Sequence, residues 1–299
     1  MGSKQKTVIV TGASQGIGAG VVRGFLDRGY NVVANSRNIT KSGAFTESAQ
    51  LALVDGNIGD SAVAAKVAET AISKFGSIDA LVNNAGIFST KAFTDYTAED
   101  FEALSNTNIE GFLYVTQGAV KQMLAQRSSG SVVNITTSLA VNPVAGVTAS
   151  VPMITKGGLE AVVRSLASEY AKEHIRFNAV APGPVDTPLH KDNPKEFLKT
   201  LSPMNGVSSV KEIVDAALFL TEAPHRGAAD NRGGAARRRR RASGKMVTQL
   251  SAQASAETAK IRLTRKSAAY WVATFNNPPF NIVGSPHEKN SRTDSRGHG

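Results

Sequence analysis

Residues 7–18 read TVIVTGASQGIG and decide the fold. The apolar run from Thr7 to Val10 predicts a buried strand, and a helical pattern from Gly16 to Arg28 follows almost at once. A glycine-rich turn between a strand and a helix can bind phosphate, because the first amide groups of the helix point at it. Here Gly12 permits the tight turn, Gly16 lets backbone approach a pyrophosphate, and Gly18 lets the helix pack on the strand.

Short apolar runs continue to alternate with longer amphipathic stretches as far as about residue 222. The predicted strands are Thr7 to Val10, Asn31 to Ala34, Leu51 to Val54, Ala80 to Val82, Ser131 to Ile135 and Arg176 to Val180. The predicted helices are Gly16 to Arg28, Ser61 to Phe75, Ala98 to Arg127, Met153 to Glu173 and Val210 to Thr221. Such alternation predicts an α/β fold with a doubly wound, mostly parallel Rossmann-type sheet that is covered on both faces.

The composition excludes several classes of protein. The chain contains no cysteine and its five histidines show no ligand spacing, so we expect neither disulfides nor a metal site. No apolar run is long enough to span a membrane, and the first residues lead into a strand rather than a signal sequence. We therefore expect a soluble, cytoplasmic protein without membrane partners.

The net charge of +10 is confined to the end of the chain. Residues 1–223 hold 19 Lys and Arg against 20 Asp and Glu, whereas residues 224–299 hold 15 against 4. The five arginines from Arg237 to Arg241 could bind nucleic acid, but a solvated, disordered linker with little to bury is the simpler interpretation. We predict a Rossmann domain over residues 1–223, an Arg-rich linker over 224–245, and a tail over 246–299 that is poorly structured or a hairpin fragment.

Six ordered motifs resemble the pattern of the short-chain dehydrogenase/reductase family over residues 5 to 222 or so. One is a serine and threonine cluster that follows the strand ending at Ile135. The others are Thr11-Gly12-x-x-x-Gly16-x-Gly18, Asn83-Asn84-Ala85-Gly86, Asn108-x-x-Gly111, Thr155-Lys156-Gly157-Gly158, and Arg176 to Gly183 followed by Thr187-Pro188. The resemblance implies a nicotinamide dinucleotide as cofactor and a small carbonyl or alcohol as substrate.

The resemblance also implies which residues bind the cofactor. They are Gly12, Ser14, Gln15, Gly16, Ile17, Gly18, Ser36, Arg37, Asn57, Asn84, Ala85, Gly86, Lys156, Pro182, Gly183 and Thr187. The second strand ends in Ser36-Arg37 and lacks the carboxylate that would accept from a ribose 2′-hydroxyl, so NADP(H) is expected in preference to NAD(H). The alternative is that Arg37 is only a solvated surface charge. Asn57 stands where the family usually has an aspartate beside the adenine.

The catalytic residues of the family are present except for one. In the family the general acid is a tyrosine that stands four residues before a lysine. In this chain Lys156 matches the lysine, but Pro152 stands at the position of the tyrosine. By resemblance, Asn108 supports the proton relay, and Ser138 or Thr137 polarises the substrate carbonyl, with Ser138 ahead. Water, a less demanding substrate or His190 could compensate for the missing phenol, although His190 also fits a plain surface histidine.

Three functions follow from these residues. The first is an NADP(H)-preferring oxidoreductase, slowed by the loss of the tyrosine; the second is a catalytically inactive NAD(P)-binding regulator. The third, nucleic-acid binding through the tail, is the least expected. The family commonly pairs through long helices, so we expect a homodimer.

The family also has a closing strand after its last helix, and residues 225–232 cannot form it. A shift of reading frame near Pro224 would explain this loss. From about Met246 onward, Lys260 to Leu263 and Tyr270 to Asn281 resemble the opening hairpin of enoyl-CoA hydratase-like (crotonase) proteins. No catalytic stretch of that family is included, so this second resemblance implies no activity.

Overall fold

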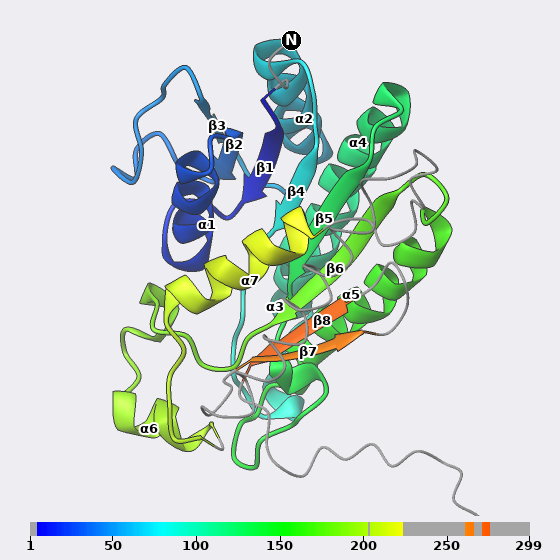
Figure 1. Cartoon of the computed structure of the whole chain (residues 1–299). Coiled ribbons are helices and arrows are strands. Elements are labelled where there is room, and N and C mark those ends of the chain that lie inside the picture. Colours follow the sequence, from blue (N-terminus) through cyan, green and yellow to red (C-terminus); the bar gives the residue numbers. More distant parts are fainter. Residues whose placement is uncertain (1–4, 203, 224–260, 266–270, 276–299) are drawn as a thin grey trace, which may run out of the picture.

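The strand order of the sheet is β3-β2-β1-β4-β5-β6-β8-β7 in the computed structural model, which describes residues 5–202, 204–223, 261–265 and 271–275 (Figure 1). The strands are β1 Thr7–Thr11, β2 Asn31–Ser36, β3 Leu51–Asp55, β4 Ala80–Asn83, β5 Gly130–Ile135, β6 Ile175–Ala181, β7 Ile261–Arg265 and β8 Trp271–Phe275. Strands β1 to β6 are all parallel to their neighbours. The predicted Rossmann-type sheet is therefore confirmed.

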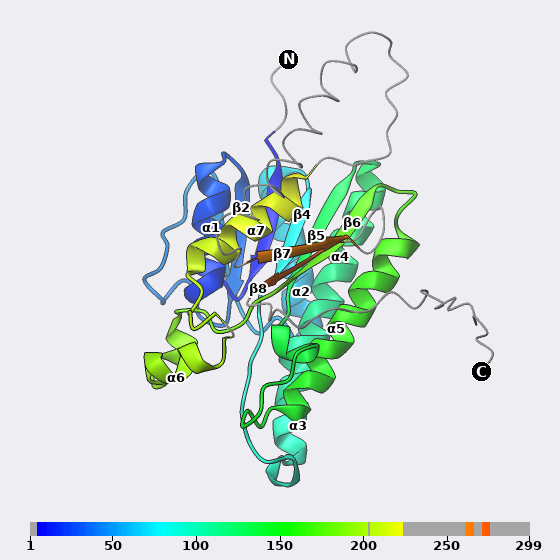
Figure 2. The same cartoon turned by 60° about the horizontal axis from the view of Figure 1, so that its bottom comes forward.

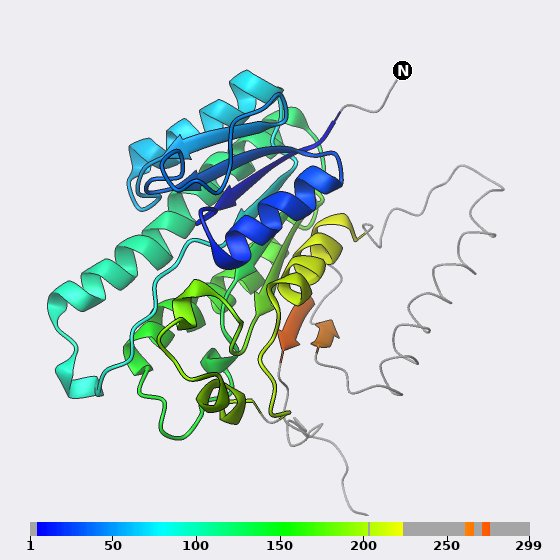
Figure 3. The same cartoon turned by 90° about the vertical axis from the view of Figure 1, so that its left-hand side faces the viewer.

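Helices cover both faces of the sheet, and each face has its own apolar core. The helices are α1 Gly16–Asp27, α2 Ser61–Phe75, α3 Ala98–Ser105, α4 Gly111–Gln126, α5 Ser150–Glu169, α6 Lys195–Thr200 and α7 Val210–Glu222. Helices α1 and α7 pack on one face, and α2, α4 and α5 pack on the other (Figure 3). Successive strand residues alternate between the two cores, so that Val8 and Val10 lie in the first and Ile9 in the second. This two-sided burial explains the continuous apolar runs in the sequence.

Two predicted helices differ from the observed ones. The helix predicted over residues 98–127 is interrupted by a π-helical turn, Asn106–Glu110, between α3 and α4. The helix predicted from Met153 begins at Ser150, which places Pro152 within its first turn. Proline is tolerated there because the first amide groups of a helix have no partner inside it. Periodicity alone does not reveal either feature.

The order of the strands changes direction at β1. β2 and β3 follow on one side of β1, whereas β4, β5 and β6 follow on the other. At such a switch point the loops leave the sheet in opposite directions, and ligands of doubly wound folds bind in the crevice that results. The turn after β1 and residues 84–87 after β4 meet at this position. The fold thus places the glycine-rich motif where a dinucleotide would be expected.

Two strands of the tail belong to the same sheet. β8 runs parallel to β6, and β7 runs antiparallel to β8 (Figure 1 and Figure 2). Residues 225–232 and the Arg-rich linker, 224–245, lie outside the described residues. The place beside β6, where a closing strand would be expected, is taken by β8.

No helix in the described ranges combines the length and the apolar character needed to cross a membrane.

Candidate active site

The glycine-rich turn has the backbone conformation that its sequence predicts. Gly12 and Gly16 have φ values of +64° and +54°, in the left-handed region that favours glycine. A methyl group added at Gly12 would lie 2.7 Å from Ala85 Cα, so the turn touches the loop after β4. Asn84 Nδ2 donates to the carbonyls of Thr11 (3.1 Å) and Gly12 (3.0 Å). The two expected cofactor segments are therefore fastened to one another.

The first amide groups of α1 are available to an anion. Gln15 occupies the N-cap position but makes no side-chain capping bond, and the first turn contains no acidic residue. Helix amide groups without a cap and with a positive dipole end attract phosphate. Ser14 is half-buried and Gln15 exposed, whereas half-buried Ile17 packs against the apolar core below. Ile17 thus holds the turn to the core rather than presenting a polar group.

The end of β2 has one polar atom without a partner. Ser36 Oγ is buried and makes no hydrogen bond to any residue in the described part of the chain. A buried hydroxyl without a partner is unfavourable by about 1–3 kcal/mol, so such an atom is expected where a ligand supplies the bond. Arg37 follows it, is exposed, and forms no ion pair with a described residue. Hydroxyl and guanidinium together are the groups that bind a phosphate.

Asn57 is exposed but already has two partners. Its Nδ2 donates to Asn106 Oδ1 at 2.8 Å, and its Oδ1 accepts from the amide of Gly59 at 3.2 Å. Asn106 begins the π-helical turn, and its own amide donates to Glu110 at 2.9 Å. Asn57 therefore connects the loop after β3 to the π-helical turn before α4, in addition to any contact with an adenine.

Lys156 is buried close to the exposed backbone of Gly86. Its Nζ donates to the carbonyl of Ile135 at 3.1 Å. A methyl group added at Gly86 would lie 2.8 Å from that Nζ and 3.1 Å from Asn108 Oδ1. Burial lowers the pKa of Lys156 from 10.5 to about 8. Only a residue without a side chain at position 86 leaves space above the ammonium group.

Asn108 lies in the π-helical turn and clamps the loop after β4. Its Oδ1 accepts from the amide of Ile87 at 2.9 Å, and its Nδ2 donates to the Ile87 carbonyl at 3.1 Å. The same Nδ2 donates to Thr155 Oγ1 at 3.0 Å, next to Lys156 in the chain. A π-turn often marks a functional site. Here it brings Asn108 between the loop after β4 and α5.

Ser138 and Thr137 have different environments. Thr137 Oγ1 accepts from the amide of Leu139 at 3.3 Å, which caps a short helical turn. Ser138 is buried, its amide donates to the carbonyl of Pro182 at 2.8 Å, and its hydroxyl makes no hydrogen bond within the described residues. The structure thus leaves the hydroxyl of Ser138 available for a substrate and links it to the segment after β6.

The first turn of α5 contains no phenol. Pro152 is buried one helical turn before Lys156, and its carbonyl accepts from Thr155 Oγ1 at 2.9 Å. Residues four apart share a helix face, so Pro152 and Lys156 are neighbours on it. The place of the expected acid is occupied by a ring without a titratable proton.

The segment after β6 lies over the glycine-rich turn. A methyl group at Gly16 would lie 3.4 Å from Thr187 Cβ, which brings the predicted Thr187 to the start of α1. Pro182 is buried and Gly183 half-buried at the start of this segment. Half-buried His190 follows, and burial lowers its pKa below 6.5, so that at pH 7 it is mostly neutral. A neutral imidazole is a weak replacement for a phenol as proton donor.

Two residues of the site were not predicted as functional. Thr11 Oγ1 accepts from the amides of Asn84 (3.1 Å) and Ala85 (3.0 Å), so it orders the loop after β4. Asn83 is buried and donates to Thr116 and Asn134, while its Oδ1 has no partner among the described residues. Thr11 and Asn83 both lie within the motifs identified in the sequence, but only the residues next to them were expected to contact a ligand.

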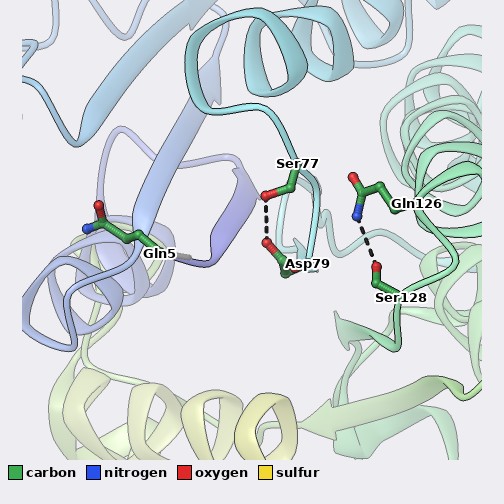
Figure 4. Close-up of a pocket in the computed structure, with 5 residues that line it drawn as sticks. All are labelled: Gln5, Ser77, Asp79, Gln126 and Ser128. Atoms are coloured by element: carbon green, nitrogen blue, oxygen red, sulfur yellow. Dashed lines mark hydrogen bonds between the residues drawn. The ribbon is translucent and has the colours of Figure 1, made fainter. Parts of the chain in front are cut away.

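A polar pocket of about 260 Å³ lies at the opposite, amino edge of the sheet (Figure 4). It is lined by Gln5, Ser77, Asp79, Gln126 and Ser128. Ser77 donates to Asp79 at 2.9 Å, and Gln126 donates to Ser128 at 3.0 Å. Because these groups bind one another, we assign the pocket a structural role.

Comparison with known proteins shows that residues 12–228 are similar to reductases. A family model described as enoyl-(acyl carrier protein) reductase matches residues 12–228. The 3-oxoacyl-(acyl-carrier-protein) reductase of Thermotoga maritima is 32% identical over 223 residues, covering 72% of this chain and 89% of that protein. The enzyme of that name from Bos taurus is 33% identical over 229 residues, covering 74% and 92%.

Two solved structures share the fold. ElxO with NADP bound superposes with a TM-score of 0.68 at 27% identity, covering 73% of this chain and 92% of that chain. The 3-ketoacyl-(acyl-carrier-protein) reductase from Brucella melitensis complexed with NADH has a TM-score of 0.68 at 27% identity, covering 74% and 93%. One structure holds NADP and the other NADH, so this likeness alone does not choose between the cofactors.

Proposed function

The chain belongs to the short-chain dehydrogenase/reductase family, and we propose that it is an NADP(H)-preferring oxidoreductase acting on a small carbonyl or alcohol. The observation that carries the proposal is the position of Lys156. Its buried Nζ faces the exposed backbone of Gly86 at the carboxyl edge of the sheet, near the glycine-rich turn. A buried ammonium group beside backbone is suited to bind the hydroxyls of a ribose.

The residues present fit the cofactor at four places. The uncapped start of α1 suits a pyrophosphate, and Ser36 with Arg37 suits a 2′-phosphate. Lys156 suits the second ribose, and Pro182 to Thr187 the nicotinamide end. NADPH supplies a hydride when bound. Ser138 then holds the substrate carbonyl by donating its hydroxyl hydrogen, and Asn108 keeps the loop after β4 in place.

Delivery of a proton to the developing alkoxide is the step for which this site is least well equipped. Pro152 has none to give, and His190 is mostly neutral at pH 7. We propose that water held by Lys156 and Ser138 supplies it, at a rate roughly 10²- to 10⁴-fold below that of an enzyme with a general acid. The same observation favours a second candidate, an NAD(P)-binding regulator without turnover.

A fluorescence titration of NADPH and NADH into the full-length chain tests the proposal. Saturable binding that favours NADPH, with slow oxidation of NADPH by acetoacetyl-CoA, is the result we expect. Acetoacetyl-CoA is chosen because two of the similar proteins are named 3-oxoacyl reductases. Binding without turnover for any carbonyl tried would favour the regulator, and absence of binding would exclude both candidates.

Arg37→Ala should weaken NADPH binding about tenfold or more and leave NADH binding nearly unchanged. A charge-assisted bond to phosphate contributes about 1.5–3 kcal/mol, and about 1.4 kcal/mol corresponds to tenfold in affinity. The dissociation constants of NADPH and NADH, measured for the variant and the wild type, test this prediction. Lys41→Ala, which removes another exposed cation of the same loop, is the matched control. Equal loss for NADPH and NADH would rule out a 2′-phosphate contact.

NADPH affinity should fall about tenfold as the pH rises from 7 to 9.5, because Lys156 loses its proton at a pH of about 8. As the pH rises, the effect of Lys156 on the stability of the folded chain is opposite to its effect on NADPH affinity. Its folded pKa lies below the unfolded 10.5, so the unfolded chain binds more protons between pH 8 and 10.5 and stability rises there. Lys156→Met should show weak affinity without this pH dependence. Titrations at several pH values, with a melting curve at each, separate the two effects.

We also propose a cytoplasmic homodimer that pairs through α4 and α5, without nucleic-acid binding. Leu113 and Leu124 on α4 and Val162 on α5 are large apolar side chains about 40% exposed, as expected for residues that a partner covers. Sedimentation velocity should give the mass of a dimer, and Val162→Lys should give a monomer. A monomeric wild-type chain would contradict the pairing.

A further inference from the structure

We propose that the hairpin of β7 and β8 positions the cofactor-binding segment of residues 182–187 by closing the sheet beside β6. The proposal makes part of the tail a working element of the cofactor site. Its consequence for NADPH rests on the proposed function, whereas the strand pairing itself can be tested without any cofactor.

The pairing between β8 and β6 is confined to the carboxyl end of β6. Val272, Ala273 and Thr274 lie opposite Ala179, Val180 and Ala181. On its other side β6 pairs with β5 from Ile175 to Val180. The contact with β8 thus supports the last three residues before Pro182, where the segment over the cofactor site begins.

Support at the end of β6 matters because the segment that follows β6 contacts two parts of the proposed site. The carbonyl of Pro182 accepts from the amide of Ser138, and Thr187 lies against Gly16. A displacement of the end of β6 would therefore move a proposed substrate residue and the segment over the phosphate-binding turn together. The adenosine end of the site, at Ser36, is formed by β2, so a displacement of β6 would not move it.

Without β8 the end of β6 would be an open edge. Every residue of a strand has an amide and a carbonyl that need partners, and a buried edge without them is unfavourable. Ala179, Val180 and Ala181 are each at most 1% exposed. Among the described strands, β8 alone lies on that side of β6. The hairpin lies beyond residue 228, where the family match ends, so the match does not include it.

A cysteine pair tests the pairing in the full-length chain, which has no cysteine of its own. Ala179→Cys with Val272→Cys joins two Cα partners, and neighbouring strands bring Cα atoms within the range of a disulfide. We expect rapid oxidation to a cross-linked monomer, identified by mass spectrometry. The matched control, Ala179→Cys with Thr274→Cys, is two residues out of register and should react slowly. Equal rates or no cross-link would overturn the proposal, as would a cross-link exclusively between two chains.

Ala273→Pro tests the effect on the site. β8 lies between β6 and β7, so proline at any of its positions removes a ladder hydrogen bond. NADPH affinity should fall about tenfold, while affinity for adenosine 2′,5′-bisphosphate, which lacks the nicotinamide half, should change less than about twofold. Proline at Ser251, outside both strands, should retain wild-type affinity for both ligands and is the control.

The outcomes separate the proposal from general destabilisation. Equal weakening of both ligands by Ala273→Pro, or no weakening of either, would overturn the positioning role. If the wild-type chain binds no NADPH, the proposed function fails on its own, and the cysteine pair still reports whether β8 lies beside β6.

Discussion

Pro152→Tyr should raise the rate of carbonyl reduction by roughly 10²- to 10⁴-fold, the contribution of a well-placed general acid. Position 152 lies one helical turn before Lys156 on the same face of α5, so a phenol there would lie beside the ammonium group. That cation would favour the phenolate and lower the pKa of the new tyrosine. The rate of NADPH oxidation with acetoacetyl-CoA measures the gain.

Pro152→Phe is the matched control, because it supplies the ring without the hydroxyl. It should leave the rate within a few-fold of the wild type, and Pro152→Tyr combined with Lys156→Met should lose most of the gain. A gain shared by phenylalanine would show that the proline acts by its shape. No gain with tyrosine, in a variant that still binds NADPH, would favour the regulator over the enzyme.

The tyrosine variant should also fold, for a reason found in the helix. Pro152 is the third residue of α5, where its missing amide is not needed. A substitution there removes no hydrogen bond from the helix, so the backbone change by itself should alter the unfolding free energy by no more than about 1 kcal/mol. The loss of the family's acid thus left the scaffold intact.

Local chemistry made much of the site predictable from the sequence. Gly12 and Gly16 adopt positive φ because the turn requires it, and Lys156 reaches the carboxyl edge because it lies near the start of α5, six residues after Ser150. These features depend on residues close together in the chain, which periodicity and motif spacing describe well. The doubly wound, mostly parallel sheet followed from the βαβ alternation for the same reason.

Features that depend on distant residues were not predictable. The choice between Thr137 and Ser138 depends on hydrogen bonds to Leu139 and to Pro182, and the second of these joins β5 to β6. The π-turn at Asn106 depends on contacts with the loop after β3. The register of β8 on β6 joins residues more than ninety positions apart, and no local pattern encodes such a pairing.

Gly12→Ala should lower NADPH affinity by at least about a hundredfold, which corresponds to roughly 2.7 kcal/mol. Two effects combine at this position. The residue has φ +64°, and a side chain in that conformation costs about 1–2 kcal/mol. The added methyl group would also lie 2.7 Å from Ala85 Cα and 2.9 Å from Asn84 Nδ2, closer than van der Waals contact allows. The turn and the loop after β4 would have to separate, which breaks the bonds from Asn84 to Thr11 and Gly12.

Gly29→Ala separates strain from steric overlap, because Gly29 has φ +76° and no atom within 4 Å of the added methyl group. It should share the 1–2 kcal/mol loss of stability and keep its affinity for NADPH, since Gly29 lies beyond the end of α1. Fluorescence titration and thermal melting of both variants give the comparison. If both lost affinity equally, the turn at Gly12 would matter only through stability. If Gly12→Ala kept its affinity, the cofactor would have to bind elsewhere than at the switch point between β1 and β4.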